Sequence, residues 1–261
     1  MMRPVTMLDH DLLFVAAVSS LETLRARLLA SPCLQPGRRP LVVRWNAASA
    51  ADALNPVLDA RPAARWVVWV HQDVVLPEGW DERFLREAER VAGPSGDGGS
   101  GDAGSGGSPA SGQAAVLGVY GVSGTGEAAI HAGCVLDRGQ WLRGPAPLPC
   151  QVDSLDEMLF AVPGDSPLRL DPAMGFDLYA TDLVLQAQAR GLNAQAIDAP
   201  CEHWSDTPER GPMPAALIDR VARSGDAFEA KWARRLPVQT PCFAIHRGGD
   251  VRRIAESFPR A

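Results

Sequence analysis

The stretch WVVWVHQDVVLPEGW, from Trp66 to Trp80, decides the fold and points to a site. Its first five residues are all apolar, which predicts a strand buried on both faces at the centre of a parallel sheet. His71, Gln72 and Asp73 follow this strand directly, before a Leu-Pro-Glu-Gly turn. Ligands of open parallel sheets bind at the carboxyl ends of the strands. The sequence therefore predicts a candidate site at this strand end.

His71 and Asp73 are two residues apart, so on an extended backbone their side chains point to the same side. An imidazole and a carboxylate on one side suit a divalent cation or a ribose. The alternative is structural, because these residues would equally form a polar strand end that meets solvent.

The composition sets limits on the class of protein. The chain has 261 residues, 46% hydrophobic and 21% charged, so it can bury a sizeable core as one large domain or two small ones. Its net charge of -6 disfavours nucleic acid and anionic membranes as partners, because both attract a basic surface. Five scattered cysteines without a CxxC pair predict reduced thiols and a cytoplasmic location. The apolar run LLFVAAV is far too short to span a membrane, and we expect no transmembrane segment.

Strand-like and helix-like segments alternate along the chain, which predicts an α/β fold with a mostly parallel central sheet flanked by helices. The Gly/Ser-rich segment Gly93–Gly112 is interpreted as a flexible surface insertion, because the strand after it is expected to rejoin the same sheet. Residues 1–261 are therefore expected to form a single domain. Strands are expected at 12–20, 40–46, 65–73, 114–124 and 193–200, a strand pair at 128–144, and helices at 20–32, 49–59, 80–92, 179–190 and 214–236.

Three later segments carry residues that suit chemistry. VDSLDEML holds Asp156 and Glu157 beside the expected start of an apolar helix, and FDLYATDL holds Asp177 and Asp182 near the start of the next one. The helix dipole alone also favours acids at these positions, so a structural interpretation stays open. His203 follows a predicted strand in IDAPCEHWSD, in an expected polar loop, where a lone histidine equally suits a structural role.

In this order, the segments resemble the glycosyltransferase family 2-like proteins of the GT-A fold, specifically a bacterial branch with a His-Gln-Asp motif. The resemblance implies a single GT-A domain, like that of nucleotide-diphospho-sugar transferases. It also implies an inverting, divalent-metal-dependent enzyme that moves a sugar from a nucleotide-diphosphate sugar to the hydroxyl of a glycan, a lipid-linked molecule or a small molecule. The matching segments, within roughly residues 10–240, are NAASAADALN, VWVHQDVVLPEGW, VLGVYGVSG, VDSLDEMLF, GFDLYATDLVLQAQARGL, IDAPCEHWS and KWARRLPV.

The resemblance implies metal-binding and catalytic roles for specific residues. A D-x-D-like motif of this fold binds Mn²⁺ or Mg²⁺, and here Asp73 matches its last acid while His71 replaces the first. The imidazole shifts the preference toward Mn²⁺ relative to Mg²⁺. His203 matches a histidine that completes the metal site. Asp182 matches the catalytic base, which takes a proton from the acceptor hydroxyl.

The resemblance also implies a set of residues that contact the donor or the acceptor. Asn46 is equally suited to cap the helix that follows it. Trp204 either stacks on a sugar or a base or closes the core, and the role of Asp177 is open. The expected contact residues are Ser19, Asn46, His71, Gln72, Asp156, Glu157 and Trp204.

Two other functions are possible on related folds. A nucleotidyltransferase usually carries a Gly-rich basic loop after the first strand, whereas here AVSSLETLRARL has no glycine and its arginines lie inside a predicted helix. That departure disfavours a nucleotidyltransferase. A non-catalytic nucleotide- or sugar-binding protein on the same fold is the alternative, because His71 replaces an acid in the metal motif.

Overall fold

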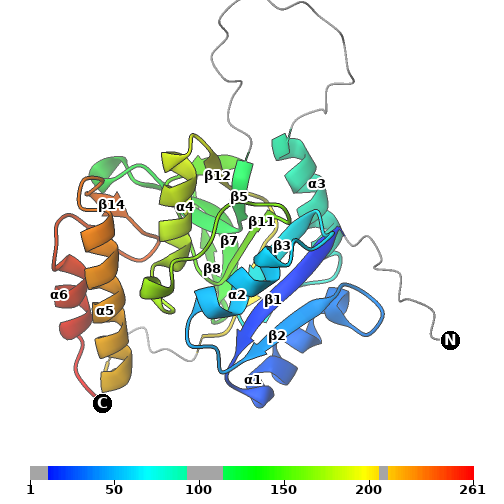
Figure 1. Ribbon diagram of the computed structural model, residues 1–261, viewed down its shortest axis with the longest axis horizontal. Helices are drawn as coiled ribbons and strands as arrows, with labels where there is room; N and C mark the ends of the chain where they lie inside the picture. The colour runs from blue at the N-terminus through cyan, green and yellow to red at the C-terminus, as the bar shows by residue number, and fades with distance from the viewer. Residues whose placement is uncertain (1–10, 93–113, 206–210) are drawn as a thin grey trace, which may run out of the picture.

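A seven-stranded sheet forms the centre of the molecule (Figure 1). The computed structural model describes residues 11–92, 114–205 and 211–261, so the predicted insertion at Gly93–Gly112 lies outside the described residues. The expected central position of the Trp66–Val70 strand is confirmed. The strand order is β2 (Leu41–Trp45), β1 (Leu12–Val18), β3 (Trp66–Val70), β11 (Leu159–Pro163), β5 (Ala114–Gly118), β12 (Asn193–Ala196) and β9 (Cys150–Val152).

The sheet is mixed rather than mostly parallel. β1 is parallel to β2 and β3, and β5 is parallel to β12, whereas β11 is antiparallel to both of its neighbours and β9 to β12. The chain reaches β11 from the short strand β10 (Ser154–Leu155), without the crossover helix that a parallel strand would need. β11 therefore begins where β3 ends, with Leu159 paired to Val70. This connection brings Asp156 and Glu157 to the carboxyl edge of β3.

A second sheet, of six strands, contains β10, β6 (Tyr120–Ser123), β7 (Ile130–Asp137), β13 (Cys201–His203) and β4 (Val74–Val75) in this order, with β8 (Gln140–Arg143) paired to β7. The predicted strand pair at 128–144 is confirmed as β7 and β8. Three other expectations need correction, because pairing in this sheet overrides the local pattern. The segment 114–124 is divided between the two sheets, 201–203 is a strand rather than a polar loop, and 152–159 forms strands and a turn rather than a helix start.

Helices cover the sheets, and all five segments predicted as helical contain one. They are α1 (Leu21–Ala26), α2 (Ala50–Asp59), α3 (Trp80–Ala92), α4 (Tyr179–Ala189) and α5 (Ala215–Lys231). The C-terminal segment after α5 adds the strand pair β14 (Val238–Gln239) and β15 (Ala244–Ile245) and the helix α6 (Asp250–Glu256). Single 3-10 turns occur at Leu28–Ala30, Pro32–Leu34, Gly126–Ala128 and Pro172–Met174. Within the described residues, no helix combines the length and apolar composition needed to cross a membrane.

Serine side chains fix the starts of the two N-terminal helices. Ser20 Oγ accepts a hydrogen bond from Thr23 N (3.1 Å) at the start of α1. Ser49 Oγ accepts from Asp52 N (3.0 Å) at the start of α2. The alternative that Asn46 caps α2 is therefore wrong. Asn46 instead lies in the left-handed region, with φ 48°, directly after β2.

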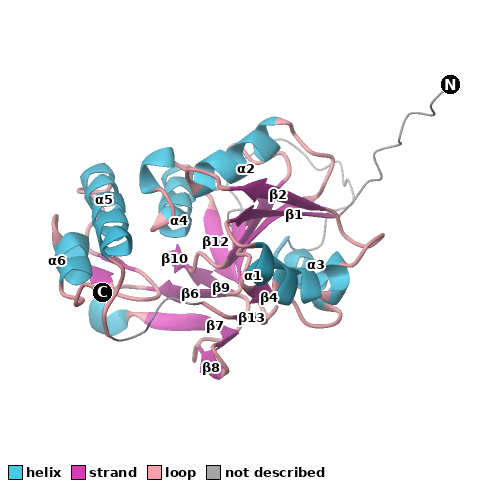
Figure 2. Ribbon diagram, turned by 90° about the horizontal axis from the view of Figure 1, so that it is seen from below, coloured by secondary structure: helices cyan, strands magenta, loops and turns pink. Residues whose placement is uncertain are grey.

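The core fills both faces of the seven-stranded sheet. Val67 and Trp69 of β3 pack into the cluster that includes α2 and α4, while Val68 and Val70 pack into the cluster that includes α1 and α3. Figure 2 shows α2 and α4 on one side of the sheet and α1 and α3 on the other. Every residue of β3 is buried, which explains why this strand is apolar without alternation. The buried strand holds the His71–Asp73 turn at a fixed place.

We predict that Gly133→Ala destabilises the fold through the junction between the two sheets. Gly133 has φ 102°, and a Cβ there would overlap the carbonyl of Val119, where the chain passes from one sheet to the other. We expect the free energy of unfolding to fall by about 3 kcal/mol or more in urea denaturation.

Gly139→Ala is the matched control, because Gly139 also has a positive φ (81°) but meets only open space. Its cost should be about 1 kcal/mol. Equal losses from the two substitutions would contradict the close approach at Val119.

Candidate metal centre

The candidate ligands come from two strand ends that the second sheet holds together. His71 and Asp73 lie in the turn between β3 and β4, and His203 is the last residue of β13. β13 pairs antiparallel with β4, and His203 lies opposite Val74. The register of this pair therefore brings a residue distant in the sequence next to Asp73.

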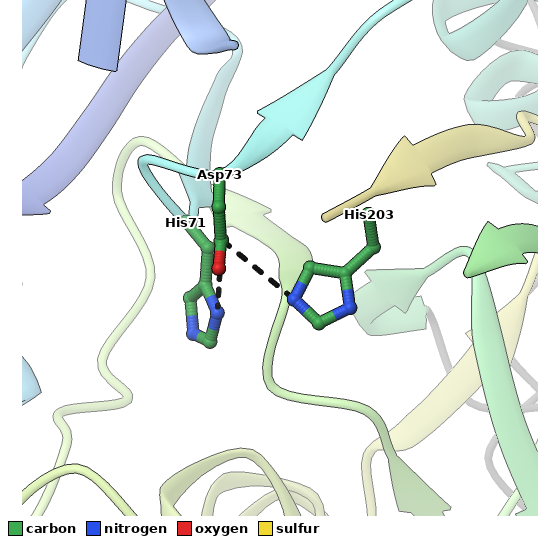
Figure 3. A group of neighbouring side chains, drawn as sticks. All are labelled: His71, Asp73 and His203. Carbon is green, nitrogen blue, oxygen red and sulfur yellow. Dashed lines mark ion pairs between the residues drawn. The ribbon is translucent and has the colours of Figure 1, made fainter. Parts of the chain in front are cut away.

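Three side chains converge at this point, as Figure 3 shows. One ligand atom from each of His71, Asp73 and His203 lies within 4.8 Å of the other two. Asp73 Oδ1 is 3.9 Å from His71 Nδ1 and 3.6 Å from His203 Nε2. Asp73 and His203, the residues expected to bind metal, thus lie together. His71, expected to contact the donor, joins them as a third possible ligand.

The ring of His203 is oriented by a carboxylate that the sequence did not single out. His203 Nδ1 lies 2.8 Å from Asp137 Oδ1, and the two residues are paired across β13 and β7. An ionised carboxylate only accepts hydrogen bonds, so Nδ1 of His203 carries the proton. In the neutral ring, Nε2 then presents its lone pair toward Asp73. A carboxylate behind a histidine in this way is typical of metal ligands.

His71 is oriented by Tyr179, whose hydroxyl lies 2.7 Å from His71 Nε2. The hydroxyl donates its single proton to the carbonyl oxygen of Glu157 (3.0 Å), and Trp69 Nε1 donates to the hydroxyl oxygen (3.1 Å). With the hydroxyl proton on the carbonyl of Glu157, His71 Nε2 donates to Tyr179, and this tautomer leaves the lone pair of Nδ1 facing Asp73. Burial also lowers the pKa of His71, which favours the neutral ring.

The third candidate ligand, Asp73, offers a carboxylate oxygen that accepts no hydrogen bond from any described residue. Asp73 Oδ1 is buried and has no hydrogen-bond partner among the described residues. Two imidazole lone pairs and one carboxylate oxygen thus face one another, an arrangement that is costly unless a cation lies between them. The donor set of two nitrogens and one oxygen suits Mn²⁺ and other transition ions. A divalent cation held by three protein ligands keeps further positions for a bound substrate.

Gln72 has a different role from its two neighbours. Its Oε1 accepts hydrogen bonds from the backbone N–H groups of Ser19 and Ser20, both at 3.0 Å, and its Nε2 donates to Ser19 Oγ (3.1 Å). The side-chain amide of Gln72 therefore connects the end of β1 and the start of α1 to the His71–Asp73 turn. Gln72 also lines a cavity at this strand end, so its expected contact with the donor stays a prediction beside this structural role.

Two cavities meet at the two candidate histidine ligands. The first, of about 430 Å³, lies at the carboxyl ends of β1 and β2 and is lined by Ser19 and Asn46, together with Asp73. The second, of about 570 Å³, is lined by the acids Asp137, Asp156, Glu157 and Asp177 and by Tyr120, Thr181 and Phe243. His71 and His203 line both cavities. The candidate metal centre therefore lies at the boundary between them.

One acid of the second cavity, Glu157, has a raised proton affinity. The pKa of Glu157 lies well above its usual range, first because of burial and then because of the charges of Asp177 and Asp156. The charge of Arg220 and a hydrogen bond from the backbone of Leu178 oppose this shift. A carboxyl group of this kind in a cavity is suited to acid–base chemistry.

Asp182 does not line either cavity. It is fully buried, and its Oδ1 accepts from Lys231 Nζ (2.7 Å) and Trp232 Nε1 (2.8 Å), while Oδ2 accepts from Gln186 Nε2 (2.8 Å). These contacts join α4 to the end of α5. In this arrangement Asp182 has a structural role, and its expected role as catalytic base finds no support in its surroundings.

Trp204 also lies outside the linings of both cavities. The guanidinium of Arg27 lies 4.2 Å from the centre of its ring, and its Nε1 donates to Glu202 Oε2 (3.2 Å). The backbone N–H of Trp204 donates to the carbonyl of Asp73 (3.0 Å). Trp204 therefore holds β13 against the His71–Asp73 turn, and Arg27 covers one face of its ring.

No protein-family model matches the chain, and comparison with curated proteins found no match. Functional inference therefore rests on the residues and geometry of this site.

We predict that Asp73→Asn abolishes Mn²⁺ binding, because it removes the charged ligand that faces both histidines. Asp137→Asn should weaken Mn²⁺ binding by about 10- to 100-fold, because it loosens the orientation of His203. Isothermal titration with MnCl₂ measures both effects. Asp165→Asn, an exposed acid outside both cavities, is the control and should bind as the wild type does. Wild-type affinity in the Asp73 variant would contradict the site.

We predict that Gln72→Ala lowers the free energy of unfolding by about 1–2 kcal/mol, because two backbone N–H groups lose their acceptor. Gln72→Glu keeps the acceptor oxygens and should cost less. Urea denaturation measures both, and neither variant should change Mn²⁺ affinity by more than a few fold. Unchanged stability together with lost nucleotide binding would favour the expected role of Gln72 in donor binding over the structural one.

Proposed function

We propose that the protein is an inverting, divalent-metal-dependent glycosyltransferase on a GT-A-type fold, with a nucleotide-diphosphate sugar as its donor. The observation that carries the proposal is the convergence of His71, Asp73 and His203, as three lone-pair donors, at the boundary between two cavities. The order of segments in the sequence supports the same function. The mixed α/β sheet, with its site at the carboxyl ends of β1 and β3, is compatible with this fold.

The two cavities suit the two substrates. The first cavity, at the ends of β1 and β2, would take the nucleotide of the donor, with Ser19 and Asn46 on its lining. The second, larger cavity would take the acceptor. The acceptor hydroxyl would then attack the sugar carbon from the second cavity, while the diphosphate departs on the opposite side, into the first cavity. Such an approach supports direct displacement and therefore inversion.

His71, Asp73 and His203 would hold the cation, and a cation there supplies Lewis-acid stabilisation of the departing diphosphate. Asp137 and Tyr179 keep the two imidazoles in the tautomers that this role needs. The protein's own contribution is thus to fix three ligand atoms before substrate binds.

We assign the base to the acidic pair of the second cavity, with Glu157 as the acceptor of the proton. Glu157 lines the cavity in which the hydroxyl would lie, and Asp156 lies beside it. Its raised pKa gives it a greater proton affinity than an ordinary carboxylate, which is what a general base requires. Asp182 is the alternative base, but it would first have to leave Lys231 and Trp232.

The engagement of Asp182 favours a second candidate, a non-catalytic protein that binds nucleotides or sugars at the same site. It differs from the enzyme in one respect, since it would bind the donor without transfer or hydrolysis. A nucleotidyltransferase gains no support, because the backbone N–H groups of Ser19 and Ser20, which would face a triphosphate, are bonded to Gln72.

We predict a metal-dependent thermal shift with one class of nucleotide. A ligand at 100 times its Kd stabilises the folded state by about 2.7 kcal/mol, which corresponds to roughly 5–10 °C for a chain of this size. The screen uses nucleoside diphosphates and nucleotide sugars, each with and without Mn²⁺, on the wild type and on Asp73→Asn. The shift should need Mn²⁺ and should vanish in the variant. The absence of any shift in the wild type would contradict the proposal.

We predict that Glu157→Gln lowers kcat about 10²- to 10⁴-fold, while the Kd of the nucleoside diphosphate is unchanged. Asp182→Asn should instead lower the melting temperature, and the protein that remains folded should keep its turnover. Release of nucleoside diphosphate from the donor, by hydrolysis or transfer, measures kcat for both variants. Lost turnover in a folded Asp182→Asn protein, with normal Glu157→Gln, would move the base to Asp182. Binding without turnover in the wild type would favour the non-catalytic candidate.

A further inference from the structure

One cationic side chain shares the first cavity with the candidate metal ligands. Arg220, from α5, lines this cavity together with His71, Asp73 and His203. Its side chain is 43% exposed, so its charge is accessible to a ligand. Among the described residues that line this cavity, it is the only Arg or Lys. Nothing in the local sequence pattern of α5 distinguishes it from the other arginines of that helix.

The guanidinium of Arg220 is held in one orientation. Its Nε donates to Asp177 Oδ2 (2.9 Å) and its terminal nitrogen donates to Asp177 Oδ1 (3.0 Å). Ser224 Oγ, one turn along α5, also donates to Asp177 Oδ2 (3.2 Å). A guanidinium has five N–H donors, and this fork uses two of them. The remaining donors are therefore available to a second anion, and the group is already ordered to receive it.

The ion pair between Arg220 and Asp177 lies between the two cavities, with one partner lining each. Asp177 is among the residues that line the second cavity, whereas Arg220 is among those that line the first. The carboxylate thus faces the acceptor side and the guanidinium faces the donor side. Asp177, whose role the sequence left open, positions Arg220 in this geometry.

The charges on the donor side match a diphosphate. A divalent cation bound to Asp73 keeps a net positive charge. Arg220, although paired with Asp177, presents its unused N–H donors to an anion at a separate point of the same cavity. The diphosphate of a nucleotide sugar carries one negative charge on each of its two phosphoryl groups. A monophosphate-linked nucleotide would satisfy only one of the two positive groups.

We propose that Arg220 and the cation at His71, Asp73 and His203 bind one phosphoryl group each, and so select diphosphate-linked over monophosphate-linked nucleotides. This inference rests on the proposed function, since it concerns the donor of that reaction. It adds a specificity-determining residue, Arg220, and a positioning residue, Asp177. A merely structural Arg220, which only tied α5 to Asp177, would affect stability without affecting this selection.

The test measures the Kd values of a nucleoside diphosphate and of the monophosphate with the same base, by isothermal titration in saturating MnCl₂. The full chain is used, and the base is chosen by a first screen over all common nucleosides. The wild type should bind the diphosphate at least about 10-fold more tightly. In Arg220→Met the Kd of the diphosphate should rise about 10- to 100-fold, because charge-assisted hydrogen bonds are lost, and the Kd of the monophosphate should change little.

Two further variants keep the test specific. Arg223→Met removes an exposed arginine of the same helix that lines neither cavity, and it should bind both ligands as the wild type does. Arg220→Lys keeps the charge and a partner for Asp177 but loses the fork, and it should lie between the wild type and Arg220→Met. The affinity for Mn²⁺ alone should be the same in all variants.

Undiminished selection of the diphosphate in Arg220→Met, with Mn²⁺ bound, would overturn this inference and leave the proposed function standing. A wild type that binds Mn²⁺ but no nucleoside diphosphate would overturn both. If Arg220→Met also loses Mn²⁺ binding, the ratio of the two Kd values in Arg220→Lys tests the inference instead. A reduced ratio of the two Kd values in Arg220→Lys supports the inference, and a wild-type ratio overturns it.

Discussion

The rest of the site depends on the hydrogen bonds of one turn, His71 to Asp73. The backbone N–H of His71 donates to Met158 and so fixes the entry of β11, while the carbonyl of Asp73 accepts from Trp204 and so fixes the end of β13. Gln72, between them, ties down the end of β1. Because β3 is buried on both faces, this turn cannot shift without moving the core. His71 and Asp73 of this turn are thus candidate metal ligands, while Gln72 between them bonds the backbone after β1.

The hydrogen-bond partners of the two histidines decide which ring nitrogens face Asp73. Tyr179 and Asp137 each engage one ring nitrogen of a histidine, and each thereby exposes the other nitrogen toward Asp73. A buried carboxylate oxygen without a donor would be costly in a purely structural cluster. The arrangement is therefore better explained as a site prepared for a cation than as a chance meeting of polar side chains. The same preparation extends to Arg220, which is ordered before any anion arrives.

Local pattern in the sequence predicts the elements well and the long-range arrangement only in part. The apolar run of β3 and the starts of α1 to α5 are local signals, and the structure confirms them, whereas the helix start expected at 152–159 is wrong. The antiparallel course of β11 depends on a connection that carries no periodicity of its own. Asp137 and Arg220 became visible only through strand register and tertiary contacts, although Asp137 does end a predicted strand. Asp182 is predicted from the sequence as a site residue, but it is buried against Lys231 and Trp232. These contacts between α4 and the end of α5 cannot be read from the local sequence.

The central claim is that the strand ends of β3 and β13 hold a cation between two substrate cavities. The most direct measurement is anomalous diffraction from a crystal of the full chain soaked in MnCl₂, recorded at a wavelength where manganese scatters anomalously. We expect one dominant anomalous peak, bonded to His71 Nδ1, Asp73 Oδ1 and His203 Nε2. A soaked crystal without a peak between these three atoms, or with its main peak elsewhere, would contradict this claim.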